Sequence, residues 1–122
     1  MGDLSDDLVA PRREHPVLGV DDRVGALVMR LGGELDLYNA EELRTALARA
    51  IAGEPGRIVI DLSLVDFIDS TALGVLIEAR TQLGNDSLRL AAPQLEPRRA
   101  LQVSGLDKHL RVHETVEDAL SA

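Results

Sequence analysis

A serine follows two closely spaced aspartates in the segment Asp61–Leu76, which reads DLSLVDFIDSTALGVL. Ser70 comes directly after Asp69 and four residues after Asp66. The apolar residues that follow predict a helix, so the serine hydroxyl would stand at or beside the helix N-cap. In the simplest interpretation Asp69 or Ser70 only caps this helix, because Asp and Ser are common N-cap residues. Composition alone favours this structural role.

The same position suits a phosphorylation site. Free backbone N–H groups and the positive end of the helix dipole would accommodate a phosphate without unfolding the domain. A phosphate adds about −1.5 to −2 charges, and no Lys or Arg occurs between Arg57 and Arg80. The new charge would therefore join Asp66 and Asp69 in a negative patch. A protein docked there would meet a changed electrostatic field, which makes Ser70 a candidate local switch.

Other chemistries have weaker support. His109 and His113 are four residues apart, and in a predicted strand they would lie more than about 10 Å apart, so solvated histidines are favoured over a metal site. Gly32 and Gly33 do not have the spacing of a phosphate-binding loop. A Ser-His-Asp triad stays open, but no GxSxG motif supports it, and a small hydrolase is the least favoured hypothesis. We expect no catalytic activity, no metal and no cofactor.

Composition excludes several partner classes. The 122 residues include 21 acids against 13 Lys and Arg, and the net charge of −8 argues against nucleic acid and anionic membranes as partners. Tyr38 and Phe67 are the two aromatic residues, too few for a base-stacking platform. No apolar run approaches the roughly 18 residues of a membrane span. The absence of cysteine fits a reducing cytoplasm, where we expect a monomer or weak dimer.

Short elements of alternating type surround the serine. Apolar and alternating runs predict five strands, namely His15–Val20, Val24–Leu31, Arg57–Leu62, Ser87–Ala92 and His109–His113. Spacing, caps and breakers predict four helices: one along Leu43–Ile51, capped by Asp36 or Asn39; one over Ser70–Leu83; one with Pro97 in its first turn that ends at Gly105; and one opened by Thr115 and Asp118. Pro16 places the first strand at an edge, Gly32 and Gly33 are expected to end the second, and seven residues would connect Leu62 to the helix at Ser70.

This order predicts an α/β fold with a mixed, mostly parallel sheet of four to five strands flanked by about four helices. We expect a flexible acidic tail over residues 1–13 and a single domain over 14–121. The helix from Ser70 carries a wide apolar stripe, and part of it, Leu73, Gly74 and Ile77, could be exposed and bind another protein. Deep packing of the whole helix explains the stripe equally well.

Three motifs together resemble the STAS domain, in particular the bacterial anti-sigma-factor antagonists. The segment from Asp66 to Leu76 is similar to the family's central signature, Gly33–Asp36 (GELD) to its turn before the first helix, and Val103–Leu106 (VSGL) to the turn after its third helix. Their order and spacing extend the resemblance over residues 14 to 121. The central motif is the specific one, whereas GELD or SGL alone would be weak. Ala72 stands where the family often has glycine.

The resemblance implies a function by partner switching. The unphosphorylated antagonist would bind an anti-sigma factor that is itself an ATP-dependent serine kinase, and so release the sigma factor. Phosphorylation of the serine that matches Ser70 would dissociate the complex, and a metal-dependent serine phosphatase would reset it. Asp36 and Asp69 match acidic positions near the family's kinase contact, and Thr71 matches the small hydroxyl residue beside the serine. Glu34 of the GELD motif is a further candidate partner-binding residue. Other family branches leave an alternative, a scaffold or a subunit associated with lipid or anion transport, in which Ser70 is only a cap.

Overall fold

The computed structural model describes residues 15–84 and 86–122. The strands are β1 (Val17–Arg23), β2 (Ala26–Leu35), β3 (Ile58–Ile68), β4 (Leu88–Ala91) and β5 (Arg111–His113). The helices are α2 (Ala40–Ala52), α3 (Ser70–Leu83), α4 (Leu95–Ser104), the 3₁₀ helix η1 (Leu106–Lys108) and α5 (Val116–Ser121). No described helix is long and apolar enough to cross a membrane. The expected acidic tail over residues 1–13 lies outside the described residues.

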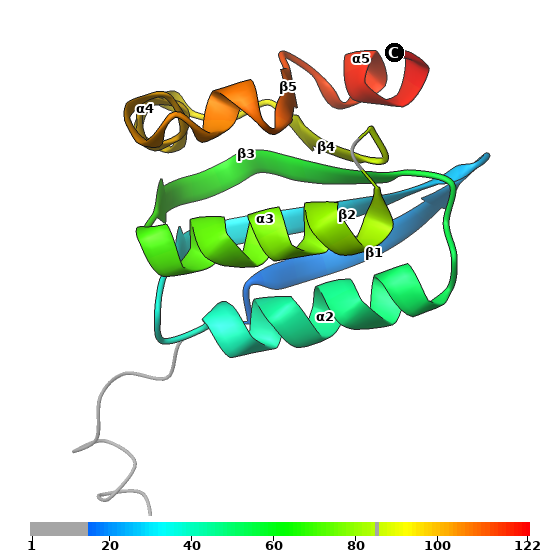
Figure 1. Ribbon diagram of the computed structural model, residues 1–122, viewed down its shortest axis with the longest axis horizontal. Coiled ribbons are helices and arrows are strands. Elements are labelled where there is room, and N and C mark those ends of the chain that lie inside the picture. The colour runs from blue at the N-terminus through cyan, green and yellow to red at the C-terminus, as the bar shows by residue number, and fades with distance from the viewer. Residues whose placement is uncertain (1–14, 85) are drawn as a thin grey trace, which may run out of the picture.

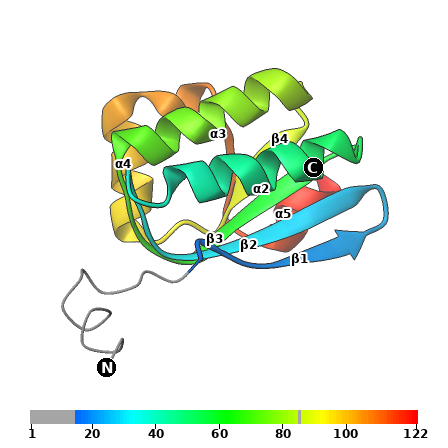
Figure 2. The ribbon, with the colours of Figure 1, turned by 90° about the horizontal axis from the view of Figure 1, so that it is seen from below.

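One five-stranded sheet organises the molecule, in the order β1-β2-β3-β4-β5 (Figures 1 and 2). β1 pairs with β2 in antiparallel fashion, and each of the other neighbouring pairs is parallel. The predicted mixed, mostly parallel α/β sheet is therefore confirmed, and β1 lies at the edge where Pro16 placed its strand. Parallel neighbours need crossover connections, and the helices after β2, β3 and β4 supply them.

The sheet separates two apolar clusters of unequal size. On one face, α2 and α3 run side by side (Figures 1 and 2), and their buried leucines pack with Ile58, Ile60 and Leu90 of the sheet and Leu101 of α4. On the other face, Ala119 of α5 packs against a small cluster that includes Val59. Alternate residues of β3 thus enter different clusters, as the pleat of a strand requires.

Two strands extend further than the sequence predicted. β3 continues to Ile68, so most of the expected connection before Ser70 is strand, and β2 continues through Gly33 to Leu35. The pairing of β2 with β3 shifts register twice, and each shift leaves one extra residue in β3. Such bulges disturb the alternation of buried and exposed residues. Gly33 lies at the second bulge with φ +74°, a backbone conformation that glycine adopts without strain.

The C-terminal third confirms the predicted stops and corrects one strand. Gly105 has φ +79° and ends α4 in the left-handed conformation, and the Thr115 side chain accepts a hydrogen bond from the backbone of Asp118 at the start of α5. The strand predicted from His109 begins only at Arg111. His109 follows η1 as its C-cap and precedes β5, so His109 and His113 do not share a strand face.

Candidate functional site

Asp69 is the N-cap of α3 and also ties that helix to the loop after β2. Its Oδ1 accepts a hydrogen bond from the Ala72 backbone N–H at 3.0 Å, and its Oδ2 accepts one from the Leu37 N–H at 3.1 Å. The Asp69 backbone N–H donates to the Leu35 carbonyl at 3.0 Å. The carboxylate therefore satisfies one of the free N–H groups of the helix and fixes a loop 32 residues away in sequence.

Ser70 occupies the first helical position and is free of the capping role. It is exposed, as is Thr71 beside it. No hydrogen bond joins Ser70 Oγ to any residue that the structure describes, because Asp69 makes the cap. No described histidine activates the hydroxyl, so a Ser-His-Asp triad has no geometric support. The arrangement presents an unengaged hydroxyl at the start of a fixed helix.

The loop after β2 is held by its own polar side chains. Asn39 Oδ1 accepts from the Asp36 N–H at 2.9 Å, Asn39 Nδ2 donates to the Glu34 carbonyl at 2.7 Å, and Asp36 Oδ1 accepts from the Tyr38 N–H at 3.0 Å. Asn39 is the N-cap residue of α2, but its side chain caps no helical N–H. The prediction that Asp36 or Asn39 caps α2 is thus confirmed for the position of Asn39, while the side chains of both residues form hydrogen bonds within the turn before the helix.

The predicted partner-binding residues fall into three groups by exposure. Glu34, Thr71 and Gly74 are exposed, while Asp69 and Ile77 are partly buried. Leu73 is only 5% exposed and packs in the main core, so its predicted exposure is wrong. Asp36 is likewise 8% exposed. Deep packing therefore explains much of the wide apolar stripe on α3.

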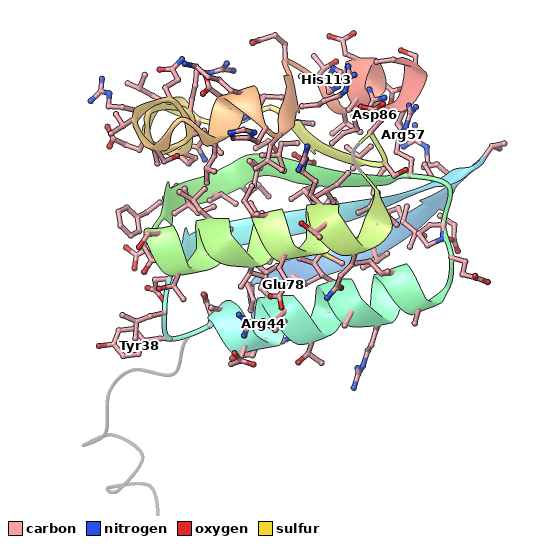
Figure 3. All side chains as sticks on the ribbon, in the orientation of Figure 1. Tyr38, Arg44, Arg57, Glu78, Asp86 and His113 are labelled. Carbon is pink, nitrogen blue, oxygen red and sulfur yellow. The ribbon has the colours of Figure 1, made fainter. Side chains whose placement is uncertain are left out.

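Three exposed apolar side chains near Ser70 were missed by the sequence analysis. Leu37 and Tyr38 lie in the loop that Asp69 holds, and Phe67 lies three residues before Ser70 in β3. Tyr38 is 72% exposed, and Figure 3 shows its ring pointing away from the body of the protein. The two aromatic residues of the chain are thus both exposed near the same helix end, in a loop and at a strand end that periodicity did not identify.

The charges around this end are acidic. Asp66 and Glu34 are exposed, and no cation occurs in residues 58–79. Arg44 of α2 is paired with Glu41 and, at 2.8 Å, with Glu78 of α3, and it points toward Glu78 in Figure 3. A phosphate on Ser70 would therefore add charge beside carboxylates, with Asp69 the adjacent residue.

A contrasting cationic cluster lies beneath α5, near the edge of the sheet. Arg57 donates to the carbonyls of Ala119 and Leu120 at 3.1 and 2.8 Å, and the buried Arg89 lies 3.2 Å from His113 Nε2. Burial, followed by repulsion from Arg57 and Arg111, lowers the pKa of Arg89. Burial, followed by repulsion from Arg89, lowers the pKa of His113. Figure 3 labels Arg57 and His113 beside α5.

Comparison with known proteins agrees with this geometry. The STAS domain family model matches residues 16–119. The anti-sigma-F factor antagonist RsfB of Mycobacterium tuberculosis is 36% identical over 103 residues, which cover 84% of each chain. The crystal structure of an anti-sigma factor antagonist from Mycobacterium paratuberculosis has a TM-score of 0.78 and 34% identity, over 84% of this chain and 88% of that one.

The Bacillus protein SpoIIAA is similar in two states. The anti-sigma factor antagonist in its unphosphorylated form has a TM-score of 0.70, and the phosphorylated form has 0.62, each at 25% identity. The superpositions cover 84% of this chain, and 92% and 96% of the two SpoIIAA chains. With a family model that matches residues 16–119 and a relative 36% identical over most of both lengths, this chain belongs to the STAS domain family.

Proposed function

We propose that this chain is a cytoplasmic anti-sigma-factor antagonist that phosphorylation of Ser70 switches off. The unphosphorylated form binds an anti-sigma factor with serine kinase activity and so frees the sigma factor. In the switching step the γ-phosphoryl group of ATP moves to Ser70 Oγ, ADP leaves, and the hydroxyl proton is released. A metal-dependent serine phosphatase hydrolyses the phosphoserine and restores binding.

The observation that carries the proposal is the unengaged Ser70 hydroxyl at the first position of α3. Because Asp69 makes the cap, Ser70 can be modified without loss of a helix-capping hydrogen bond. The helix N-terminus tolerates the added negative charge. Phosphorylation thus changes the surface and leaves the fold in place.

The docking surface combines exposed apolar side chains with a polar border. Leu37, Tyr38 and Phe67 supply the apolar area, and Tyr is a residue type enriched at the energetic centre of interfaces. Glu34 and Thr71 lie exposed beside them. This surface fits a partner with apolar groups, and a phosphate on Ser70 would repel a carboxylate that such a partner places beside it.

The relatives support the same assignment. RsfB and the Mycobacterium paratuberculosis protein carry names that describe antagonists of anti-sigma factors. The structures of SpoIIAA in both unphosphorylated and phosphorylated forms belong to a relative that is itself phosphorylated. The alternative, a STAS subunit without a switch, has no observation here that favours it.

The proposal is tested by phosphorylation and binding with the anti-sigma factor captured from the source cell. We expect ATP-dependent phosphate on Ser70 by mass spectrometry and none on a Ser70→Ala variant. Ser70→Asp should weaken kinase binding by about tenfold or more, because like charges meet at the interface. Ser63→Asp introduces the same charge at an exposed position of β3 seven residues earlier, and should bind like the wild type.

Two results would contradict the proposal. Phosphate found on Thr71 alone would move the switch away from Ser70. Equal binding by the wild type, Ser70→Asp and Ser63→Asp would leave Ser70 without a regulatory role and favour the scaffold or transport-associated alternative.

A further inference from the structure

A concave region lies away from Ser70, among the C-terminal half of α3, helix α4, η1 and strand β5. Its volume is about 560 Å³, which is within the range of small-molecule sites. Arg80 comes from α3, Arg98 from α4, Lys108 from η1 and Arg111 from β5. Segments between residues 80 and 113 thus meet around one cavity.

The charge of this cavity is opposite to that of the chain. Four Lys or Arg side chains line it against two aspartates, Asp86 and Asp107, whereas the whole chain carries −8. Two of the cations are engaged in exposed ion pairs, Arg111 with Asp86 at 2.9 Å and Arg98 with Glu114 at 3.2 Å. Arg80 and Lys108 make no ion pair with any described residue, so neither charge is neutralised by direct contact.

Arg80 is the distinctive member of this cationic group. Its Nε–H is buried and has no hydrogen-bond acceptor among the described residues. A buried donor without an acceptor is rare in folded proteins and calls for a specific explanation, such as a role in binding an anion. Turning this side chain toward an anion in the cavity would break no hydrogen bond to a described residue and would provide the acceptor that Nε–H lacks.

We propose that this cavity binds a small polyanion, a molecule with two or more phosphate or carboxylate groups. The planar guanidinium of Arg80 matches the paired oxygens of either group. Lys108 is exposed on η1 and adds a second cation. Its flexible side chain can adjust its position to ligands of different shape. Four Lys or Arg side chains against two aspartates in its lining distinguish this cavity from the acidic surface around Ser70.

The polyanion site does not depend on the proposed phosphorylation switch. Ser70 and Arg80 are ten residues apart on one helix, which corresponds to about 15 Å along its axis. A ligand in the cavity would contact α3 near its C-terminus, whereas the proposed kinase contact lies at its N-terminus. Failure of either proposal would therefore leave the other intact.

The test is calorimetric titration of the full chain with inorganic pyrophosphate and, separately, with citrate, at constant ionic strength. We expect saturable binding of one ligand per chain. Arg80→Gln should weaken it by about tenfold, since it removes a charge-assisted hydrogen bond. The matched control Arg99→Gln removes the same charge from an exposed residue of α4 that does not line the cavity, and should change affinity by less than about twofold.

The two ligands distinguish phosphate from carboxylate chemistry, because the tighter one identifies the group that Arg80 recognises. Lys108→Gln provides a second variant whose site is exposed, so a folding defect of Arg80→Gln would not hide the answer. The proposal is overturned if neither ligand binds saturably. It is also overturned if the Arg80 and Lys108 variants weaken binding no more than Arg99→Gln does. The ligand would then be attracted by the overall positive charge of the region and not by a specific site.

Discussion

The two ends of α3 differ in the charge around them and in whether their buried hydrogen-bond donors have acceptors. At its N-terminal end, Asp69 satisfies two backbone donors, and the surrounding surface is acidic with exposed apolar side chains. Near its C-terminal end, Arg80 leaves a buried donor unsatisfied beside a cavity lined with cations. Figure 1 shows the helix passing from one region to the other along the sheet.

This difference indicates which end can change charge by modification and which can change it by binding. An added phosphate at the acidic end raises repulsion toward acidic partners, so it suits release of a bound protein. An added anion at the cationic end lowers repulsion among Arg and Lys side chains, so it suits capture of a ligand. Buried residues between the ends, Leu73 and Leu76 among them, hold the helix fixed for both.

Replacing Asp69 should have the largest effect on the free energy of unfolding. It removes the acceptor of two backbone donors at the N-terminal end of α3 and leaves the C-terminal end unchanged. Asp69→Ala removes the α3 cap and the acceptor for Leu37, and loss of an N-cap typically costs about 0.5–2 kcal/mol. With two bonds lost, we expect the free energy of unfolding to fall by about 1–2 kcal/mol. Urea denaturation measures it.

Asp66→Ala is the matched control for that variant. Asp66 is exposed in β3 and its side chain makes no hydrogen bond or ion pair with a described residue, so its replacement should change stability by less than about 0.5 kcal/mol. Equal losses of stability in the two variants would mean that Asp69 contributes through its charge alone. The two hydrogen bonds of Asp69 would then not stabilise the N-terminal end of α3.

Gly74→Ala should stabilise α3 between its two ends without changing either end. A Cβ at Gly74 would meet nothing within 4 Å, and alanine is favoured over glycine inside a helix by about 0.8–1 kcal/mol. We expect a gain of about 0.5–1 kcal/mol in the free energy of unfolding, measured by thermal or urea denaturation.

Gly105→Ala makes the same chemical change at a position where φ is +79°. Because left-handed backbone strains alanine by about 1–2 kcal/mol, this variant should lose stability. A loss at Gly74 as well would show that its face of α3 has no room for a methyl group, contrary to its exposure.

The sequence predicted the helix from Ser70 to Leu83 because local signals agree there: an acidic cap, a long apolar stripe and a terminal glycine. It underestimated β3 because two bulges disrupt the alternation on which strand prediction relies. The polar Ser63 and Asp66 then resembled a connection. Exposure of Leu64 and Phe67 reinforced that pattern, since neither falls on a regular buried face.

The candidate sites differ in the same way. Ser70 was identified from adjacent residues, whereas the surface formed with Leu37 and Tyr38 depends on a hydrogen bond to Asp69 across 32 positions. The cationic cavity was missed because its lining comes from separate elements that only the tertiary fold brings together. No local pattern identifies Arg80 as unsatisfied, because that property depends on the packing around it.

The smallest expected effect is on the pH dependence of stability, through His113 in the cationic cluster. Burial, followed by repulsion from Arg89, lowers the pKa of His113 from its ordinary value of about 6.5. The unfolded chain therefore binds a proton more readily than the folded chain as the pH falls below that value. The stability contributed by neutral His113 is complete above the unfolded pKa and is lost as the pH falls through the folded pKa.

His113→Gln tests this dependence because glutamine does not titrate and offers an amide oxygen as acceptor for Arg89 Nη1 in place of His113 Nε2. Between about pH 7.5 and pH 5, the free energy of unfolding should fall less in this variant than in the wild type, as measured by urea denaturation at each pH. His109→Gln, at an exposed position, is the comparison variant. If both substitutions alter the pH dependence equally, burial beside Arg89 is not the cause, and the contrast between the two sides of the molecule does not extend to proton binding.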